Sequence, residues 1–318
     1  MRIVFMGTPE FAVPSLAALL RSDHTVVGVV TQPDRPKGRG QELAESPIKQ
    51  LATRHKIPIL QPLKMKDPGL RDSLSSWKPD LIVVAAFGRI LPKVILDLPP
   101  RHCINVHASL LPKYRGAGPI QWAIIRGERE TGITTMLMDE GMDTGAILLQ
   151  EKIQIAPDDT AGTLSSKLAD IGGRLLLDTL TRLQDGTLTP QPQDSSRATM
   201  APLLKKEDGL LDWTLPAVDL ANRVRGLSPW PGAYAYFGEE RWVIWKAEVL
   251  DRSAAVVPPG TIMDTTKEGL AVATGVGLLH IMEFQPANSR RMSAAQYLAG
   301  HTLTPGLRLG PPPPTTAA

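Results

Sequence analysis

The sequence is poor in cysteine and in long apolar runs, and each shortage excludes a class of protein. Cys103 is the single cysteine among 318 residues, so an intrachain disulfide framework is impossible and a cysteine-based zinc cage is disfavoured. No stretch approaches the ~18 consecutive apolar residues of a membrane-spanning helix. The first residues resemble a strand that enters a glycine turn, not a secretory signal, so we expect a cytoplasmic protein.

A strong excess of charge of one sign is also absent. The chain has 35 Lys and Arg against 32 Asp and Glu, which leaves a net charge of +3 at pH 7. That balance permits an anionic partner without demonstrating one. The composition, with 42% hydrophobic and 21% charged residues, is that of an ordinary globular protein. The length suggests about two domains.

Strand and helix patterns alternate along the first 188 residues. Helical spacing of apolar residues is clearest over Thr160–Leu183, and it also appears over Phe11–Leu20 and Ile48–Arg54. This alternation predicts an α/β fold whose mostly parallel sheet is covered on both faces. Short apolar runs rich in β-branched residues predict the strands: Ile3–Met6, Val26–Thr31, Leu81–Ala85, Ile104–His107 and Thr134–Met138.

A polar, proline-rich stretch divides the chain. Residues 189–208 predict an extended linker, which sets a first domain at 1–188 and a second at 209–310. The second domain predicts a helix at Val218–Val224 and then a small barrel or sandwich. The proline-rich residues 311–318 predict a disordered tail. The expected strands of the second domain are Ala233–Phe237, Arg241–Leu250, Gly260–Met263, Leu270–Ala273 and Gly277–Phe284.

Asn105 and His107 form the most informative polar pair of the first domain. Side chains alternate along a strand, so Cys103, Asn105 and His107 share one face. A buried strand that carries an amide and an imidazole indicates a cleft near its carboxyl end. Cys103 lies ~13 Å from His107 along the strand, too far for a nucleophile–base pair, which leaves it as a buried apolar thiol. His102 faces the opposite side from His107, so we expect no metal site.

A second cluster, Met138–Gly145, lies at the end of the predicted strand Thr134–Met138. If the two strands are parallel neighbours, this turn lies at the same end of the sheet as His107. A plain turn and a carboxylate that orients the imidazole both remain open at this point. The glycine turn at Gly7 lacks the full dinucleotide fingerprint, and the chain has no Walker loop. An amide, an imidazole and a carboxylate without a serine or cysteine nucleophile favour direct acyl transfer to an amine.

The order of the motifs resembles that of the folate-dependent formyltransferases. Further motifs narrow the resemblance to the methionyl-tRNA formyltransferases, and the likeness extends from Arg2 to about Arg308. The motifs that resemble the folate-dependent formyltransferases as a whole are Asn105-x-His107, Ser109-Leu110-Leu111-Pro112, Tyr114-Arg115-Gly116 and Asp139-x-Gly141-x-Asp143-Thr144-Gly145. The motifs that narrow the resemblance to the methionyl-tRNA formyltransferases are Gly7–Ala12, Thr31–Gly40 and Ser228-Pro229-Trp230-Pro231.

The resemblance implies a Rossmann-like parallel-sheet formyltransferase domain followed by a small OB-like β-barrel domain that holds tRNA. It implies transfer of the formyl group of 10-formyltetrahydrofolate to the amino group of methionyl initiator tRNA. Asn105 and His107 would stabilise the oxyanion, and Asp143 would orient His107 and move the amine proton. The resemblance implies no metal. We expect a monomer that does not bind a membrane. The implied folate-binding residues are Ser109, Leu110, Leu111, Pro112, Phe87, Gly88, Ile90 and Asp139.

The loop Gln32–Leu43 is the expected tRNA-recognition element. Its glycines would let Arg35, Lys37 and Arg39 reach phosphates or the acceptor end. Gln41-Glu42 stands where many family members have two lysines, which lowers the charge of the loop. In the second domain Lys206 is the expected tRNA contact. Further candidates there are Lys205, Arg223, Arg225, Arg290 and Arg291.

Three alternatives share parts of this pattern. A sugar-nucleotide formyltransferase can have the same catalytic residues, but the basic loop and the Gly7–Ala12 turn argue against it. A formyltetrahydrofolate hydrolase would use water in place of the amine. A catalytically silent tRNA- or folate-binding protein would not need Asn105, His107 and Asp143 together.

Overall fold

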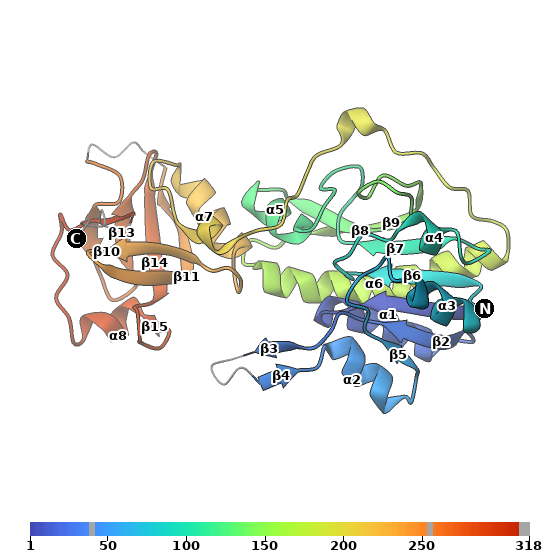
Figure 1. Ribbon diagram of the computed structural model, residues 1–318. Helices are drawn as coiled ribbons and strands as arrows, with labels where there is room; N and C mark the ends of the chain where they lie inside the picture. Colours follow the sequence, from blue (N-terminus) through green and yellow to red (C-terminus); the bar gives the residue numbers. More distant parts are fainter. Residues whose placement is uncertain (38–41, 253–256, 312–318) are drawn as a thin grey trace. The chain divides into compact units, whose positions relative to one another are not determined.

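The computed structural model describes residues 1–37, 42–252 and 257–311, and the chain folds into two compact units (Figure 1). Unit 1 contains Met1–Pro119, Glu130–Gln154 and Ser165–Pro202. Unit 2 contains the chain from Leu203 onward together with Ile120–Arg129 and Ile155–Leu164. Unit 2 therefore includes two short pieces that precede residue 165, well before the rest of this unit begins at Leu203.

Unit 1 is built on a seven-stranded sheet of order β5-β2-β1-β6-β7-β8-β9. The strands from β5 to β7 are parallel, and β8 and β9 continue the sheet antiparallel. This confirms the expected α/β fold with a mostly parallel sheet. The strands are β1 (Arg2–Gly7), β2 (Thr25–Val30), β5 (Ile59–Leu60), β6 (Leu81–Ala85), β7 (Cys103–His107), β8 (Glu130–Leu137) and β9 (Ile147–Gln154).

Strand β6, at the centre of the sheet, is apolar throughout because both faces of the sheet are covered. Every residue of β6 is buried. On one face of β7 the Cys103 sulfur lies 3.7 Å from the Leu96 carbonyl of a short helix. On the other face, a Cβ built on Gly172 would lie 3.0 Å from Val106. The helices of this unit are η1 (Glu10–Ala12), α1 (Val13–Leu20), α2 (Pro47–Arg54), α3 (Pro68–Ser76), α4 (Lys93–Leu96) and most of α6 (Ala161–Gln184).

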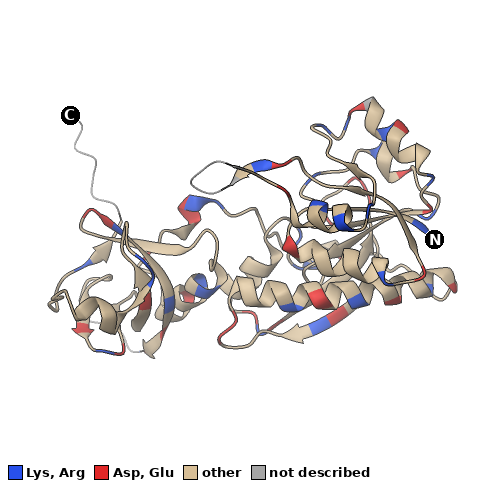
Figure 2. Ribbon diagram, turned by 90° about the horizontal axis from the view of Figure 1, so that it is seen from below, with Lys and Arg blue, Asp and Glu red and all other residues tan. Residues whose placement is uncertain are grey.

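The longest helix, α6, has the apolar stripe that its sequence predicts. Leu164, Leu168, Ile171 and Leu175 are all buried. The glycine at 173 is required by close packing, because a Cβ there would lie 2.9 Å from the Pro14 carbonyl oxygen of α1. The exposed side of the helix alternates in charge (Figure 2). Within the described residues no helix combines the length and the apolarity needed to span a bilayer.

Unit 2 contains an antiparallel sheet of order β12-β13-β14-β11-β10-β16, with β15 paired to β14. The two ends of this series are joined, because Ile262 N donates to Leu307 O and Leu309 N donates to Gly260 O, each at 2.8 Å. The curled sheet agrees with the OB-like architecture expected for the second domain. The strands are β10 (Ala233–Phe237), β11 (Glu240–Asp251), β12 (Ile262–Thr265), β13 (Leu270–Ala273), β14 (Leu278–Gln285), β15 (Met292–Ser293) and β16 (Leu309–Gly310).

Aromatic side chains fill the core of unit 2. Trp242 is 1% exposed, stacks on Phe284 with ring centroids 4.6 Å apart, and meets Tyr297 edge-on at 5.0 Å. Trp122 and Ile125 pack against this core from the piece that precedes β8. The helical elements of unit 2 are η3 (Lys206–Gly209), α7 (Ala217–Gly226), α8 (Ala294–Leu298) and almost all of α5 (Pro119–Ile125).

Residues 189–202, named here the connecting segment, are extended apart from the short turn η2 (Ser195–Arg197). They are bonded to unit 1 by backbone pairs. Gln191 and Ile147 exchange two hydrogen bonds of 2.8 Å, and Arg115 N donates to Thr199 O at the same distance. A polar, proline-rich sequence thus runs along unit 1 before the chain enters unit 2 at Leu203.

Candidate active site

Asn105, His107 and Asp143 meet on one side of β7. Asn105 Nδ2 lies 3.4 Å from Asp143 Oδ1, and His107 Nδ1 lies 3.6 Å from Asp143 Oδ2. The two β7 side chains share a face because they are two residues apart. His107 is 6% exposed and the Asp143 side chain 17%. The three polar groups therefore form a largely buried cluster, in which the Asp143 side chain keeps part of its surface exposed.

The route by which Asp143 reaches His107 differs from the expectation. The strand that precedes it, β8, is antiparallel to β7, with Ile104 opposite Leu137 and His107 opposite Thr134. The two strands are therefore not parallel neighbours, and the end of β8 lies beside the start of β7. The loop that follows β8 is long enough to return along β7, and this return brings the carboxylate to the imidazole.

The loop geometry requires its glycines and its aspartates. Asp139 Oδ1 accepts hydrogen bonds from Gly141 N at 3.0 Å and from Thr144 Oγ1 at 2.7 Å. A Cβ on Gly145 would collide with the Leu137 carbonyl oxygen. Asp143 itself has a φ of +55°, a left-handed conformation in which aspartate is tolerated. Asp139 thus stabilises the turn, and the turn places the Asp143 carboxylate beside His107.

A backbone amide and a backbone carbonyl complete the cluster. Gly116 N donates to Asp143 Oδ2 at 2.8 Å. His107 Nε2 lies 2.9 Å from Tyr114 O. A carbonyl oxygen can only accept, so Nε2 carries a proton. The other ring nitrogen, Nδ1, then faces the Asp143 carboxylate, and a proton bound there would lie between imidazole and carboxylate.

Cys103 takes no part in this cluster. Its sulfur lies against the carbonyls of Ile95 and Leu96 at 3.9 and 3.7 Å. Burial raises the pKa of the Cys103 thiol to about 12. A thiol with that pKa is protonated at neutral pH, which agrees with its interpretation as a buried apolar residue. Among the residues that the structure describes, no group of three or more His, Cys, Asp or Glu is arranged to hold a metal ion.

The expected folate-binding run after β7 is mostly buried. Ser109 is fully buried, and its hydroxyl donates to Lys113 O at 2.6 Å. Leu111 is 3% exposed, and its amide donates to Thr134 Oγ1 at 3.1 Å. Leu110 and Pro112 are partly exposed. The Ser109 hydroxyl and the Leu111 amide therefore hold the turn in place, and the partly exposed Leu110 and Pro112 are the positions open to a ligand.

The second expected folate segment lies at the end of β6. Phe87 is 2% exposed, and its carbonyl accepts from Gln32 Nε2 at 2.8 Å. Gly88 has a φ of +72°. Ile90 is 73% exposed, which is unusual for isoleucine and offers apolar surface to a ring. Asp139 lines a polar pocket of about 460 Å³ beside His102 at the start of β7, and neither Ile90 nor His107 is among its lining residues.

The expected tRNA contacts are only partly described. Arg35 begins strand β3 (Arg35–Lys37) of the hairpin that β4 (Glu42–Ala44) completes; it is exposed and donates to Gln32 Oε1 at 3.1 Å. The Lys37 side chain and the whole of Arg39 lie outside the described residues, as does the tail from residue 312. Lys206 is exposed in η3.

Two of the further basic candidates are bonded within unit 2. Arg225 Nη1 donates to Asp159 O at 2.8 Å, and Arg223 Nη2 donates to Asp208 O at 2.9 Å. Burial lowers the pKa of the Arg225 guanidinium. These hydrogen bonds tie both guanidinium groups to the fold of unit 2.

The structure also shows contributors that the sequence did not reveal. The Tyr114 carbonyl and the Gly116 amide belong to a motif that was noticed, but backbone groups leave no signal in a sequence. Gln193 was assigned to a linker, yet its Nε2 donates to Asp143 O at 2.9 Å and to Gly145 O at 2.8 Å. A glutamine in a polar run gives no indication of such a contact.

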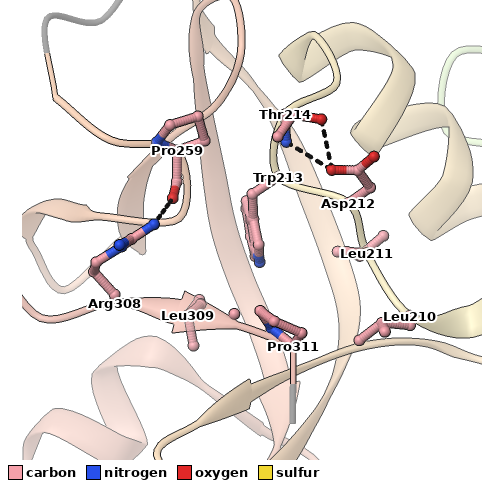
Figure 3. Close-up of a pocket in the computed structure, with 10 residues that line it drawn as sticks. Leu210, Leu211, Asp212, Trp213, Thr214, Pro259, Arg308, Leu309 and Pro311 are labelled. Atoms are coloured by element: carbon pink, nitrogen blue, oxygen red, sulfur yellow. Dashed lines mark hydrogen bonds between the residues drawn. The ribbon is translucent and has the colours of Figure 1, made fainter. Parts of the chain in front are cut away.

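Unit 2 has a separate apolar pocket of about 420 Å³ (Figure 3). Trp213 lies in its middle, and the buried indole Nε1 has no hydrogen-bond partner among the described residues. The charged groups at its rim are already bonded, Arg308 to the Pro259 carbonyl and Asp212 to Thr214. Asn105, His107 and Asp143 belong to unit 1, so this pocket is not the candidate active site.

Comparison with known proteins gives this cluster a context. Residues 1–180 match the family model described as formyl transferase, and residues 203–302 match the model of the formyl transferase C-terminal domain. The chain belongs to the formyl transferase family. A methionyl-tRNA formyltransferase of Trichlorobacter lovleyi is 51% identical over 310 residues, which cover 98% of this chain and 97% of that protein. Another from Acetivibrio thermocellus is 50% identical, over 98% of this chain and 100% of that protein.

A solved formyltransferase supports the fold. The N-formyltransferase from Helicobacter canadensis, in complex with folinic acid and dTDP-3-aminofucose, covers 92% of this chain and all of its own length at a TM-score of 0.67. Its sequence identity of 18% shows a shared architecture and nothing finer. The likeness to methionyl-tRNA formyltransferases, which the motifs predicted, is confirmed by the relatives near 50% identity.

Proposed function

We propose that the chain transfers the formyl group of 10-formyltetrahydrofolate to the α-amino group of methionine esterified to initiator tRNA, for the start of translation. The observation that carries the proposal is that the Asn105 amide and the His107 imidazole both lie against the Asp143 carboxylate. The relatives named above support the choice of acceptor, since both are methionyl-tRNA formyltransferases that match almost the whole chain.

The reaction needs little more than these groups. The substrate supplies the nucleophile, because an α-amino group has a pKa of about 7.7–8 and is partly neutral at working pH. Its nitrogen forms a bond to the formyl carbon, the bond from that carbon to folate N10 breaks, and one proton moves from the amine to the leaving nitrogen. No covalent enzyme intermediate is required, which agrees with a cluster that lacks an activated serine or cysteine.

The side chains divide the work of the transfer. Asn105 Nδ2 has two N–H groups, of which one points to Asp143; the other is assigned to the oxyanion that develops on the formyl oxygen. His107 contributes its positive charge to the same oxyanion when both ring nitrogens are protonated. Asp143 orients the imidazole and receives the amine proton.

The substrates are assigned to separate parts of the chain. We assign the catalytic role to residues 1–188 and the tRNA acceptor arm to residues 209–310, with 189–208 between them. The folate would contact Ile90, Leu110 and the backbone around Gly88, where surface is available beside the strand ends. Arg35, Lys37, Arg39 and Lys206 are assigned to tRNA phosphates. We expect a monomer in the cytoplasm, where its two substrates are present.

One assay separates this function from its alternatives. Formyl-labelled 10-formyltetrahydrofolate is offered with methionyl initiator tRNA, with an amino-sugar nucleotide, or with water alone. Label is expected on the aminoacyl-tRNA at a rate far above the other two. Label on the sugar nucleotide, or release as formate in water alone at the same rate, would refute the assignment. A protein that binds both substrates without transferring label would be a binding protein only.

A further inference from the structure

The connecting segment makes side-chain contacts with the candidate active site that a simple linker would not need. Two of its residues, Gln193 and Thr199, are partly buried and bond to the residues that face the His107 imidazole. Both residues belong to unit 1 by their packing, so these contacts lie within a single compact unit.

Gln193 bridges two parts of the cluster. Its amide nitrogen donates to the carbonyls of Asp143 and Gly145 at 2.9 and 2.8 Å. Its amide oxygen accepts from Arg115 Nη2 at 2.7 Å and from Arg115 Nε at 3.1 Å. Arg115 is 7% exposed, so its guanidinium is fixed. One amide thus uses its donors and its acceptor to join the Asp143 turn to a buried arginine.

Thr199 holds the other side of the imidazole. Its hydroxyl accepts from Tyr114 N at 2.9 Å, and its carbonyl accepts from Arg115 N at 2.8 Å. Tyr114 has a φ of +63°, an uncommon conformation for a bulky residue that the surrounding structure must maintain. The carbonyl of this same Tyr114 lies 2.9 Å from His107 Nε2.

These contacts converge on one function. Each ring nitrogen of His107 faces an oxygen, Tyr114 O on one side and the Asp143 carboxylate on the other. We propose that Gln193 and Thr199 are positioning residues for formyl transfer, which set the two groups that orient the His107 ring. Neither touches the reacting atoms. The inference rests on the proposed function, since it assigns these residues to that reaction.

A positioning role predicts a loss in turnover and not in substrate binding. Displacement of a catalytic group by ~1 Å can cost ~100-fold in rate. We expect Gln193→Ala and Thr199→Val to lower kcat by about 10- to 100-fold. KM for folate and for methionyl-tRNA should each stay within about threefold, since the cost falls on the reaction step.

Matched variants separate positioning from general damage. Thr199→Ser retains the hydroxyl acceptor for the Tyr114 amide, so it should restore most of the kcat that Thr199→Val loses. Gln191→Ala removes the same residue type two positions away; its side chain is exposed and its backbone pairing is kept, so it should turn over like the wild type. A merely structural role would give Thr199→Ser and Thr199→Val the same kcat once both are folded.

The experiment measures kcat, KM and the thermal midpoint of each variant with 10-formyltetrahydrofolate and methionyl initiator tRNA. If Gln193→Ala does not fold, Gln193→Glu decides. It keeps the oxygen that accepts from Arg115 but loses the donors for the carbonyls of Asp143 and Gly145, so kcat should still fall. Unchanged kcat in Gln193→Glu or Gln193→Ala, or a loss confined to KM, would overturn the inference. Absence of transfer by the wild type would instead refute the proposed function.

Discussion

The His107 imidazole is fixed through both of its nitrogens, and this has a consequence at the residue scale. Nε2 is occupied by the Tyr114 carbonyl, so proton exchange with the reaction must pass by Nδ1 and the carboxylate of Asp143. His107 therefore contributes charge and orientation more than a mobile proton of its own.

Substitution of this ring should abolish turnover and spare binding. His107→Ala is expected to lower kcat/KM by about 100- to 1,000-fold, the usual cost of losing one group that stabilises an oxyanion. The affinity for tRNA should stay close to that of the wild type, because the ring is 6% exposed and offers little contact surface. A filter-binding titration beside the transfer assay would check both. Full activity in His107→Ala would remove this residue from the mechanism.

Cys103 provides a second test at this scale. Because burial raises its thiol pKa to about 12, the folded protein should not react with a thiol reagent at pH 8. Unfolding in guanidinium should release one reactive thiol per chain, since the sequence has a single cysteine. Absorbance after addition of a disulfide reagent would count it. Rapid labelling of the folded protein would show that the interior around α4 opens readily.

At the scale of elements, the stem of the hairpin β3–β4 is tied to α2. The Lys49 ammonium forms an ion pair with Asp34, and Gln61 Nε2 donates to Asp34 Oδ1 at 2.8 Å. The hydrogen bond from Lys49, followed by that from Gln61, lowers the pKa of the Asp34 carboxyl. The element expected to meet tRNA is thus fixed at its base, whichever contacts its tip makes.

This ion pair predicts an acid-dependent contribution to stability. A carboxyl whose pKa is lower in the folded state stabilises the fold above its unfolded pKa of about 3.9 and loses that effect as pH falls through the folded value. Asp34→Asn should therefore lower the thermal midpoint by about 1–2 °C at pH 7. The difference from the wild type should shrink below pH ~4. A pH series of melting curves would measure it, and an equal difference at pH 3 would contradict it.

Regular elements were predictable where periodicity is strong. Helix α6 and strands β1, β6 and β7 lie within a few residues of their expected bounds, since burial on both faces or along one stripe leaves a clear pattern. Strand β9 has an alternating burial pattern and was missed. The antiparallel direction of β8 depends on how the chain returns to the sheet, which no local pattern specifies.

The sequence predicted the side chains of the candidate site, but it did not predict the groups that position them. Asn105 and His107 stood out as polar residues on a buried strand, and Asp143 as part of a glycine-rich turn. The Tyr114 carbonyl, the Gly116 amide and Gln193 act through positions that only the tertiary fold brings together.

At the scale of the whole molecule, unit 2 is discontinuous in sequence. Its core is covered in part by Trp122 and Ile125, and Gly162 N donates to Ser228 O at 3.1 Å. A cut after the connecting segment would therefore remove the partners of two pieces that precede it.

A fragment of residues 1–202 should fold poorly as a consequence. Apolar side chains that pack on the unit 2 core would become exposed, so we expect binding of a hydrophobic dye and a thermal midpoint lowered by more than ~5 °C. Dye fluorescence and a melting curve, each compared with the full chain, would test this. An unchanged midpoint without dye binding would mean that unit 1 and the two pieces are self-sufficient.

The short stretch Leu307–Leu309 acts as a latch on the curled sheet of unit 2. This stretch bonds to Gly260 and Ile262 at the β12 edge of the sheet, and β16 pairs with β10 at the other edge. It therefore covers both edges of the sheet at once. If this stretch detached, the unpaired backbone amides of both sheet edges could form strand pairs with a neighbouring copy of the chain. These few residues, remote in sequence from the catalytic cluster, thus bear on solubility instead of chemistry.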